Sequence, residues 1–193
     1  MLYTTRLYIR ELELSDTESI HHLHSLPETD KFNTLGIPET IQTTEALLQK
    51  WIKERKQLPR SSYIFCIEIV DTKQFIGLIA LNLGDEKFKM GEVWYKLDVK
   101  FWRKGYTTEA LTRLLDFAFN TLQLHRIEAG CAVEHIASIR VLEKVGMIRE
   151  GRKRKKLPIR GEWLDNYFYA ILEEDFNKNQ IFLCATNAGK RSK

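Results

Sequence analysis

The sequence lacks the features that define several broad classes of protein. Nowhere in its 193 residues is there a run of roughly 18 apolar residues, the length that a membrane span needs. The opening residues, MLYTTRLYIREL, contain neither the apolar core nor the cleavage site of a secretory signal. We therefore expect a cytoplasmic protein with no membrane partner.

Cysteine is scarce, and the usual glycine motifs are missing. Cys66, Cys131 and Cys184 lie 65 and 53 residues apart and form no CxxC pair, so we expect neither a disulfide framework nor a bound metal. The chain has no GxGxxG, and no GxxxxGK followed by Ser or Thr. The usual loops for dinucleotides and nucleoside triphosphates are thereby excluded.

Positive charge is gathered in two short segments. The formal net charge is +4, yet residues 149–160 carry +6 and the last five residues carry +3, which leaves about −5 for the rest. A general nucleic-acid binder would spread its basic residues over a broad surface. The distribution indicates an enzyme-like body with one basic segment, RKRKK at 152–156. This segment is either a solvated hairpin tip or a docking site for an acidic partner such as ribosomal RNA or an acidic peptide.

The hydrophobic pattern predicts one α/β (α+β) domain over residues 1–183, followed by a flexible basic tail at 184–193. Strand patterns give way to an alternation of strands and helices after residue 99, which is typical of a sheet that becomes locally parallel. We expect a mixed, mostly antiparallel sheet of six to seven strands with helices on both faces. The expected strands are 6–12, 63–70, 75–83, 91–99, 126–133 and one or two within 161–172, and the expected helices are 15–26, 42–57, 106–122 and 136–146.

The segment from Leu97 to Ala110 is a strand that ends in a basic loop with a glycine and then opens directly into an amphipathic helix. Such a junction presents free backbone N–H groups and the positive end of a helix dipole, which suit phosphate oxygens. Gly105 would let the backbone approach the ligand, and Arg103 and Lys104 add charge. The alternative is an ordinary strand-to-helix turn that needs glycine for its backbone angles.

This loop resembles motif A of the GNAT acetyltransferases, which holds the pyrophosphate of acetyl-coenzyme A. The six motif positions are filled here by Trp102, Arg103, Lys104, Gly105, Tyr106 and Thr107. The first and last of them depart from the usual pattern of Gln or Arg first and Gly or Ala last. The resemblance implies that residues 102–108, Thr108 included, bind the coenzyme.

The resemblance extends along nearly the whole chain, to the branch that acetylates the N-termini of ribosomal proteins. The matching segments, in order, are TTRLYIREL, GEVWYKL, ASIRVLEKVGMIREG and GEWLDNYFYAILEEDF. His135 stands where the family usually has an asparagine that contacts the amide arm of the coenzyme, and its ring N–H could replace that contact. In this family, the strand that corresponds to residues 91–99 splays from its neighbour. The resemblance therefore implies that the N–H groups near Leu97 and Val99 are free to bind the amide arm of the coenzyme and the oxyanion that forms during acetyl transfer.

Transfer of an acetyl group to an amine also needs a proton donor for the leaving thiolate and a base for the amine. Many GNAT enzymes use a tyrosine for the thiolate, but Leu142 stands in its place, and we expect Ser138 to substitute. Ser138 shares a helical stripe with Leu142 and Val145, although a core serine bonded to its own helix is the alternative. Glu92, which enters the cleft strand, is the candidate base, or else a solvated charge at a strand end.

Three histidines, His21, His22 and His24, lie on the first expected helix. His21 and His22 are adjacent, and adjacent side chains on a helix point in different directions, so the three histidines cannot readily share one metal ion. We therefore interpret this group as a solvated helix face rather than a metal site.

The sequence thus predicts an N-acetyltransferase that uses acetyl-coenzyme A, with the N-terminal amine of a protein or peptide as its leading acceptor. Two alternatives stay open: a small-molecule amine acetyltransferase, for polyamines or antibiotics, and a non-catalytic module that binds coenzyme A or associates with RNA. We further expect a monomer or homodimer, with possible ribosome association through residues 152–156.

Overall fold

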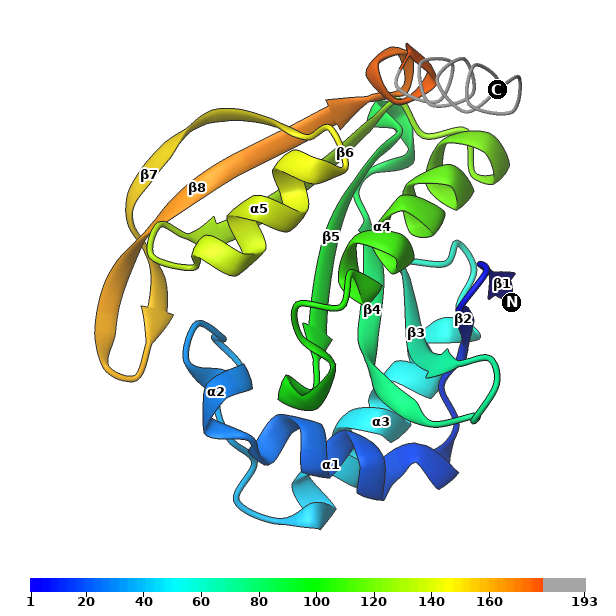
Figure 1. Cartoon of the computed structure of the whole chain (residues 1–193), viewed down its shortest axis with the longest axis vertical. Helices are drawn as coiled ribbons and strands as arrows, with labels where there is room; N and C mark the ends of the chain where they lie inside the picture. Colours follow the sequence, from blue (N-terminus) through cyan, green and yellow to red (C-terminus); the bar gives the residue numbers. More distant parts are fainter. Residues whose placement is uncertain (179–193) are drawn as a thin grey trace, which may run out of the picture.

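The structure is a computed structural model that describes residues 1–178, so the predicted tail at 184–193 lies outside the described residues. A single sheet of eight strands runs through it (Figure 1). The strands are β1 (Leu2–Tyr3), β2 (Leu7–Glu11), β3 (Ser62–Ile69), β4 (Phe75–Leu83), β5 (Met90–Leu97), β6 (Arg126–Ala132), β7 (Ile148–Ile159) and β8 (Glu162–Leu172).

The sheet is mixed and mostly antiparallel, as the sequence predicts. Its strand order is β1-β2-β3-β4-β5-β6-β8-β7, and only β5 and β6 pair in parallel. The expected number of six to seven strands is too low. The two-residue strand β1 is too short to produce an alternating pattern, and the long basic run that forms β7 has no apolar face to mark it as a strand.

Helices cover both faces of the sheet. The α-helices are α1 (Thr17–Ser25), α2 (Pro27–Asp30), α3 (Ile41–Arg55), α4 (Tyr106–Asp116) and α5 (Ile136–Lys144). The short turns are η1 (Leu14–Asp16), η2 (Glu86–Phe88), η3 (Val99–Phe101) and the π-helical turn η4 (Phe117–Thr121). The helix expected over 106–122 is therefore an α-helix that ends at Asp116 and continues as a π-turn.

Two apolar clusters lie on opposite faces of the sheet. Leu111 and Leu114 of α4 pack with Ile79 of β4, whereas Leu23 of α1 and Leu48 of α3 pack with strand residues on the opposite side. The first cluster also takes in Leu142 of α5. Because the sequence predicts a coenzyme-binding loop directly before α4, we call the side of α4 and α5 the coenzyme face, and we call the opposite side, with α1 and α3, the acceptor face.

The sheet opens between β5 and β6. These strands pair only where Met90–Glu92 lie beside Arg126–Glu128, and beyond this point they separate (Figure 1). On its other edge β6 pairs with β8 over its whole length. Residues Val93–Leu97 of β5 have no ladder partner on this side among residues 1–178. The parallel strands β5 and β6 are thus paired only at their amino-terminal ends and then diverge toward their carboxyl ends.

The basic segment 152–156 is not a hairpin tip but lies within β7. The tip of the β7–β8 hairpin is formed by Arg160 and Gly161, both with positive φ. The register between β7 and β8 shifts between Lys153 and Leu157, so residues 154–156 bulge out opposite Asp165. Among the described helices, none combines the length and apolar character that a membrane crossing requires.

Candidate active site

The loop before α4 has the geometry of an anion site. Gly105 is the N-cap of α4, with φ 80° and ψ 1°, a left-handed conformation that favours glycine. The first hydrogen bond of the helix joins the Glu109 N–H to the Gly105 carbonyl at 3.0 Å. The N–H groups of Tyr106, Thr107 and Thr108 precede that bond and point out of the helix end, so they can bind phosphate oxygens.

Arg6, near the N-terminus, holds this loop in place through hydrogen bonds. Arg6 donates from Nη1 to the Lys104 carbonyl at 3.1 Å and from Nε to Glu109 Oε2 at 2.6 Å. Thr4 Oγ1 donates to Glu109 at 2.6 Å. Burial alone would raise the pKa of Glu109, but the hydrogen bonds from Thr4 and Arg6 lower it below its ordinary value. Sequence reasoning missed Arg6, because no local pattern links it to a loop 98 residues away.

The two ends of the loop have different roles. The Trp102 indole N–H donates to the Leu97 carbonyl at 2.7 Å, so this side chain ties the loop back to the end of β5. Arg103 and Lys104 are exposed and can supply positive charge to a bound phosphate. Arg103 also has a φ of 60°, which helps to reverse the chain before Gly105.

The backbone of β5 presents free donors to the gap between β5 and β6. Asp98 N–H bonds the Ile76 carbonyl of β4 at 2.9 Å. Because successive residues of a strand alternate in direction, the N–H groups of Leu97 and Tyr95 point away from β4 and into the gap. Val99 lies beyond the strand, as the first residue of η3, where its N–H precedes the first hydrogen bond of the turn.

Ser138 lies in the coenzyme face, as its helical stripe predicts. It is 7% exposed, and its Oγ is 2.7 Å from the hydroxyl of Tyr95 on β5. Burial raises the pKa of Tyr95 well above its ordinary value, against a smaller lowering by the hydrogen bond to Ser138. The phenol therefore stays protonated at neutral pH. Leu142 leaves the family's usual tyrosine position apolar, but a tyrosine from a different element reaches the same serine.

His135 lies at the start of α5 and is half-buried. Its ring stacks on Phe32 with centroids 4.7 Å apart and an interplanar angle of 24°. Burial, with a smaller effect from Lys31, lowers the pKa of His135, so the ring is neutral at pH 7. The stacking joins α5 to the loop after α2 and leaves the ring edge as the part of His135 that can meet the coenzyme arm.

The acceptor face of β5 carries Glu92, Trp94 and Lys96 at alternating positions. Glu92 forms the last β5–β6 pair, opposite Glu128, and its side chain is exposed at the vertex where the strands diverge. Trp94 packs on Trp51 of α3. Lys96 is only 6% exposed, and burial lowers its pKa to about 8 against an opposing effect of Asp30.

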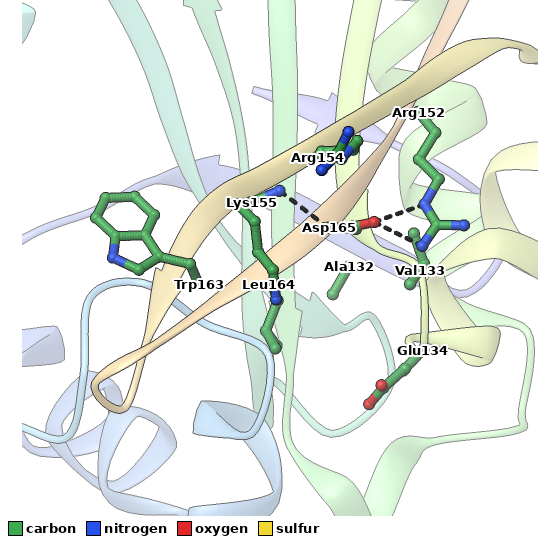
Figure 2. Close-up of a pocket in the computed structure, with 9 residues that line it drawn as sticks. All are labelled: Ala132, Val133, Glu134, Arg152, Arg154, Lys155, Trp163, Leu164 and Asp165. Carbon is green, nitrogen blue, oxygen red and sulfur yellow. Dashed lines mark hydrogen bonds and ion pairs between the residues drawn. The ribbon is translucent and has the colours of Figure 1, made fainter.

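A pocket of about 330 Å³ lies beside the bulge of β7 (Figure 2). Arg154, Lys155 and Trp163 line it together with the end of β6. Asp165 holds the bulge in place, since it accepts from Arg152 Nε at 2.7 Å and from the Lys155 N–H at 2.9 Å. Of the cations at 152–156, Arg152 is thus paired with Asp165.

The histidines of α1 do not form a solvated face. His24 is buried against Trp51, and burial lowers its pKa to about 3, with a smaller effect of Lys96. His21 Nδ1 is 2.8 Å from Thr44 Oγ1 of α3. The interpretation was wrong for His24, because α3 covers this side of α1. Within residues 1–178, no cluster of three or more His, Cys, Asp or Glu could hold a metal ion.

Comparison with known proteins agrees with this geometry. Residues 6–148 match the family model described as an acetyltransferase (GNAT) domain. The uncharacterized N-acetyltransferase YnaD of Bacillus subtilis (strain 168) is 35% identical over 176 residues, which are 90% of this chain and 98% of that protein. A GNAT-family acetyltransferase from Bacillus anthracis has a similar structure, with a TM-score of 0.78, 32% identity, and coverage of 90% of this chain and 98% of that one.

A third similar structure is spermidine N-acetyltransferase from Vibrio cholerae in complex with CoA and spermine. Its TM-score is 0.79 and its identity 25%, with coverage of 90% of this chain and 99% of that one. The resemblance expected from the residues at 102–107 is thus confirmed over most of the chain. The protein belongs to the GNAT acetyltransferase family and is an N-acetyltransferase that uses acetyl-coenzyme A.

Proposed function

We propose that this enzyme acetylates the α-amino group of a protein or peptide, with its coenzyme in the gap between β5 and β6. The pyrophosphate would lie against the N–H groups of residues 106–108, beside Arg103 and Lys104. The amide arm would run along the free N–H groups of β5, and the ring edge of His135 could meet it. This arrangement places the thioester beside the open part of β5, between the loop before α4 and the vertex where β5 and β6 separate.

Residues along the open part of β5 can carry out the transfer. The amine nitrogen attacks the thioester carbonyl carbon, and the N–H of Leu97 or Val99 can stabilise the negative charge that develops on oxygen. As the carbon–sulfur bond breaks, the sulfur takes a proton from the Tyr95 hydroxyl, which Ser138 orients. The tyrosinate that remains takes a proton from water, so the phenol is restored for the next turnover. The proton lost by the amine goes to water, through which it can reach Glu92 at the vertex. An α-amino group, with a pKa near 7.7–8.0, is partly neutral at pH 7 and needs no strong base.

Positive charge on the acceptor face is the observation that supports a peptide N-terminus, rather than a polyamine, as the acceptor. Lys96 is buried there, and its Nζ has no hydrogen-bond partner among residues 1–178. Like charges repel strongly where water is excluded, so a polyamine with several positive charges is disfavoured. A peptide N-terminus carries one such charge, which is lost before attack.

Acetylation of a small amine is the second candidate, because the Vibrio cholerae relative in complex with spermine shares this fold at 25% identity. Ribosome association through residues 152–156, a cytoplasmic location and a monomeric or dimeric state stay predictions. So do the single domain at 1–183 with its basic tail at 184–193, and the roles given to Ser138, Glu92 and the coenzyme-binding residues.

A screen of acetyl transfer tests the proposal. Release of the coenzyme A thiol would be followed with peptides, polyamines and aminoglycosides as acceptors, all at the same concentration. We expect peptides with a free N-terminus to be acetylated at least tenfold more efficiently, in kcat/KM, than spermidine. Blocking the peptide N-terminus with a formyl group is the matched control and should abolish the reaction. A higher kcat/KM for spermidine would overturn the choice of acceptor.

A further inference from the structure

We propose that Lys96, Asp30 and Asn166 form an acceptor subsite that binds an α-amino group together with the carbonyl oxygen next to it. This inference rests on the proposed function and assigns residues to its acceptor. The three side chains are 6%, 4% and 5% exposed, respectively. Each has a buried polar atom with no hydrogen-bond partner among residues 1–178: Lys96 Nζ, Asp30 Oδ1 and Asn166 Oδ1.

Lys96 is placed by β5 on the acceptor face, one residue along the chain from Tyr95 on the coenzyme face. A buried ammonium group without an acceptor costs free energy, and a buried lysine usually has a partner. The carboxylate of Asp30 affects its pKa but makes no hydrogen bond to it. The Nζ donors of Lys96 are thus available to an oxygen atom of a ligand next to the gap.

Asp30 ends α2 and is held from the hairpin tip. Arg160 donates to its Oδ2 from Nη2 at 3.1 Å and from Nε at 3.2 Å, and also donates to the Pro27 carbonyl at 3.3 Å. One carboxylate oxygen is therefore fixed, while Oδ1 keeps its full capacity to accept. This contact between residues 130 positions apart places the β7–β8 tip over α2 and closes the acceptor face on that side.

Asn166 comes from β8, on the far side of the gap. A Cβ at Gly130 of β6 would lie 3.0 Å from its Nδ2, so glycine at that position makes room for the amide. Ala129 and Cys131 of β6 point into the core of the coenzyme face, so Gly130 and the neighbouring Asn166 side chain lie toward the acceptor face. The gap is thus flanked on this face by Lys96 from β5 and Asn166 from β8.

The three free atoms match the start of a peptide. Asp30 Oδ1 and Asn166 Oδ1 are acceptors that can bind the N–H groups of an α-amine, and Lys96 Nζ is a donor that can bind the first carbonyl oxygen. A simple amine would leave Lys96 buried without a partner, and a polyamine would add charge of the same sign beside it. The set therefore selects for an amine with a carbonyl on the adjacent carbon.

Two small acceptors separate this subsite from its alternatives. L-alaninamide and isopropylamine have the same branched carbon next to the amine, but only alaninamide has the carbonyl. Their amines differ in basicity, so the useful quantity is the ratio of their kcat/KM values, compared between wild type and variants. Lys96→Met removes the donor, and Asp30→Asn, which keeps the size of the side chain, is the second variant. Lys100→Met, at an exposed lysine just beyond β5, is the matched control.

We expect Lys96→Met to lower the alaninamide to isopropylamine ratio at least tenfold, chiefly through a higher KM for alaninamide. Asp30→Asn should lower kcat/KM for both amines, and Lys100→Met should change neither. The Kd of acetyl-coenzyme A should stay within twofold in every variant, which also reports folding. An unchanged ratio in Lys96→Met, while the wild type acetylates alaninamide, would overturn the subsite and leave the proposed function standing. A wild type that uses spermidine but neither alaninamide nor peptides would overturn the proposed function itself.

Discussion

The hydroxyl of Tyr95 lies 2.7 Å from Oγ of Ser138, and this contact links β5 to α5 across the mouth of the gap. Tyr95 is half-buried on the strand that presents free N–H groups, and Ser138 faces it from the first turn of the helix. When the phenol gives its proton to the departing thiolate, the serine hydroxyl can donate a hydrogen bond to the phenolate oxygen that forms. The pair can therefore replace the single tyrosine that the family usually places where Leu142 stands.

The first prediction concerns this pair. Tyr95→Phe should lower kcat by roughly 10- to 100-fold, which corresponds to one hydrogen bond to a charge that develops in the transition state. Ser138→Ala should have a smaller effect, and the double variant should be no slower than Tyr95→Phe, because the serine acts through the tyrosine. Steady-state kinetics gives kcat for each variant, and calorimetry shows whether its Kd for the coenzyme has changed. If Ser138→Ala is the slower single variant, the serine itself donates the proton.

The second prediction concerns the coenzyme loop. Gly105→Val places a β-branched residue at φ 80° and should weaken acetyl-coenzyme A binding at least tenfold, because the N–H groups of residues 106–108 lose their alignment. Gly161→Val is the matched control, since Gly161 has the same φ of 80° at the hairpin tip and no atom within 4 Å of an added Cβ. Both affinities are measured by calorimetry. If a folded Gly105→Val variant binds acetyl-coenzyme A as tightly as the wild type, the loop before α4 is not the site that binds the coenzyme phosphates.

The third prediction concerns the stability cost of Lys96. Its pKa is about 8 in the folded protein and 10.5 ordinarily, so between these values the unfolded chain binds a proton that the folded chain does not. The free energy of unfolding should therefore rise as pH increases from 8 to 10.5. Lys96→Met should stabilise the protein by about 2–3 kcal/mol at pH 7, and the gain should shrink over that interval. Urea denaturation at pH 7 and pH 10 measures it. A gain that is the same at both pH values would show that the lysine is not charged and buried.

The fourth prediction concerns the bulge of β7. Lys153 Nζ lies 4.0 Å from the Phe168 ring centroid and Arg152 is paired with Asp165, so Arg154, Lys155 and Lys156 are the cations left for an acidic partner. Replacing these three by glutamine should weaken ribosome association and reduce its salt dependence, by about one unit of logarithmic slope for each phosphate that is no longer neutralised. Sedimentation with ribosomes over a range of salt measures this.

The same triple change should leave coenzyme affinity and acetylation of a short peptide within twofold. Replacing Lys50, Lys53 and Lys56 of α3 and its C-cap by glutamine removes equal charge elsewhere and is the control. A weaker coenzyme affinity in the bulge variant would mean that β7 contributes to the phosphate site, and would contradict the separation of the two surfaces.

Local patterns underlie the sequence predictions that agree with the structure. The amphipathic helix after Gly105, the inward direction of Ser138 and the consecutive strands before residue 99 each depend on residues within a few positions of one another. The glycine loop was found because a strand, a glycine and a helix follow directly in the chain. Such features are set by backbone preferences and by one buried face.

The features that sequence reasoning missed depend on distant parts of the chain. Tyr95 and Ser138 are 43 positions apart, and their contact requires both the splay of β5 from β6 and the packing of α5. The surroundings of Lys96 include the carboxylate of Asp30 from α2, which Arg160 holds from the hairpin tip. The bulge at 154–156 is set by Asp165 of the partner strand. A single sequence contains no local signal for these pairings.

A competition experiment tests the central claim most directly. The enzyme is given acetyl-coenzyme A and an equimolar mixture of spermidine and a peptide that has both a free N-terminus and an internal lysine, at pH 7. Mass spectrometry then locates the acetyl group. We predict that it is found on the peptide α-amine, with little on the lysine ε-amine or on spermidine. Acetylspermidine as the main product would contradict the account.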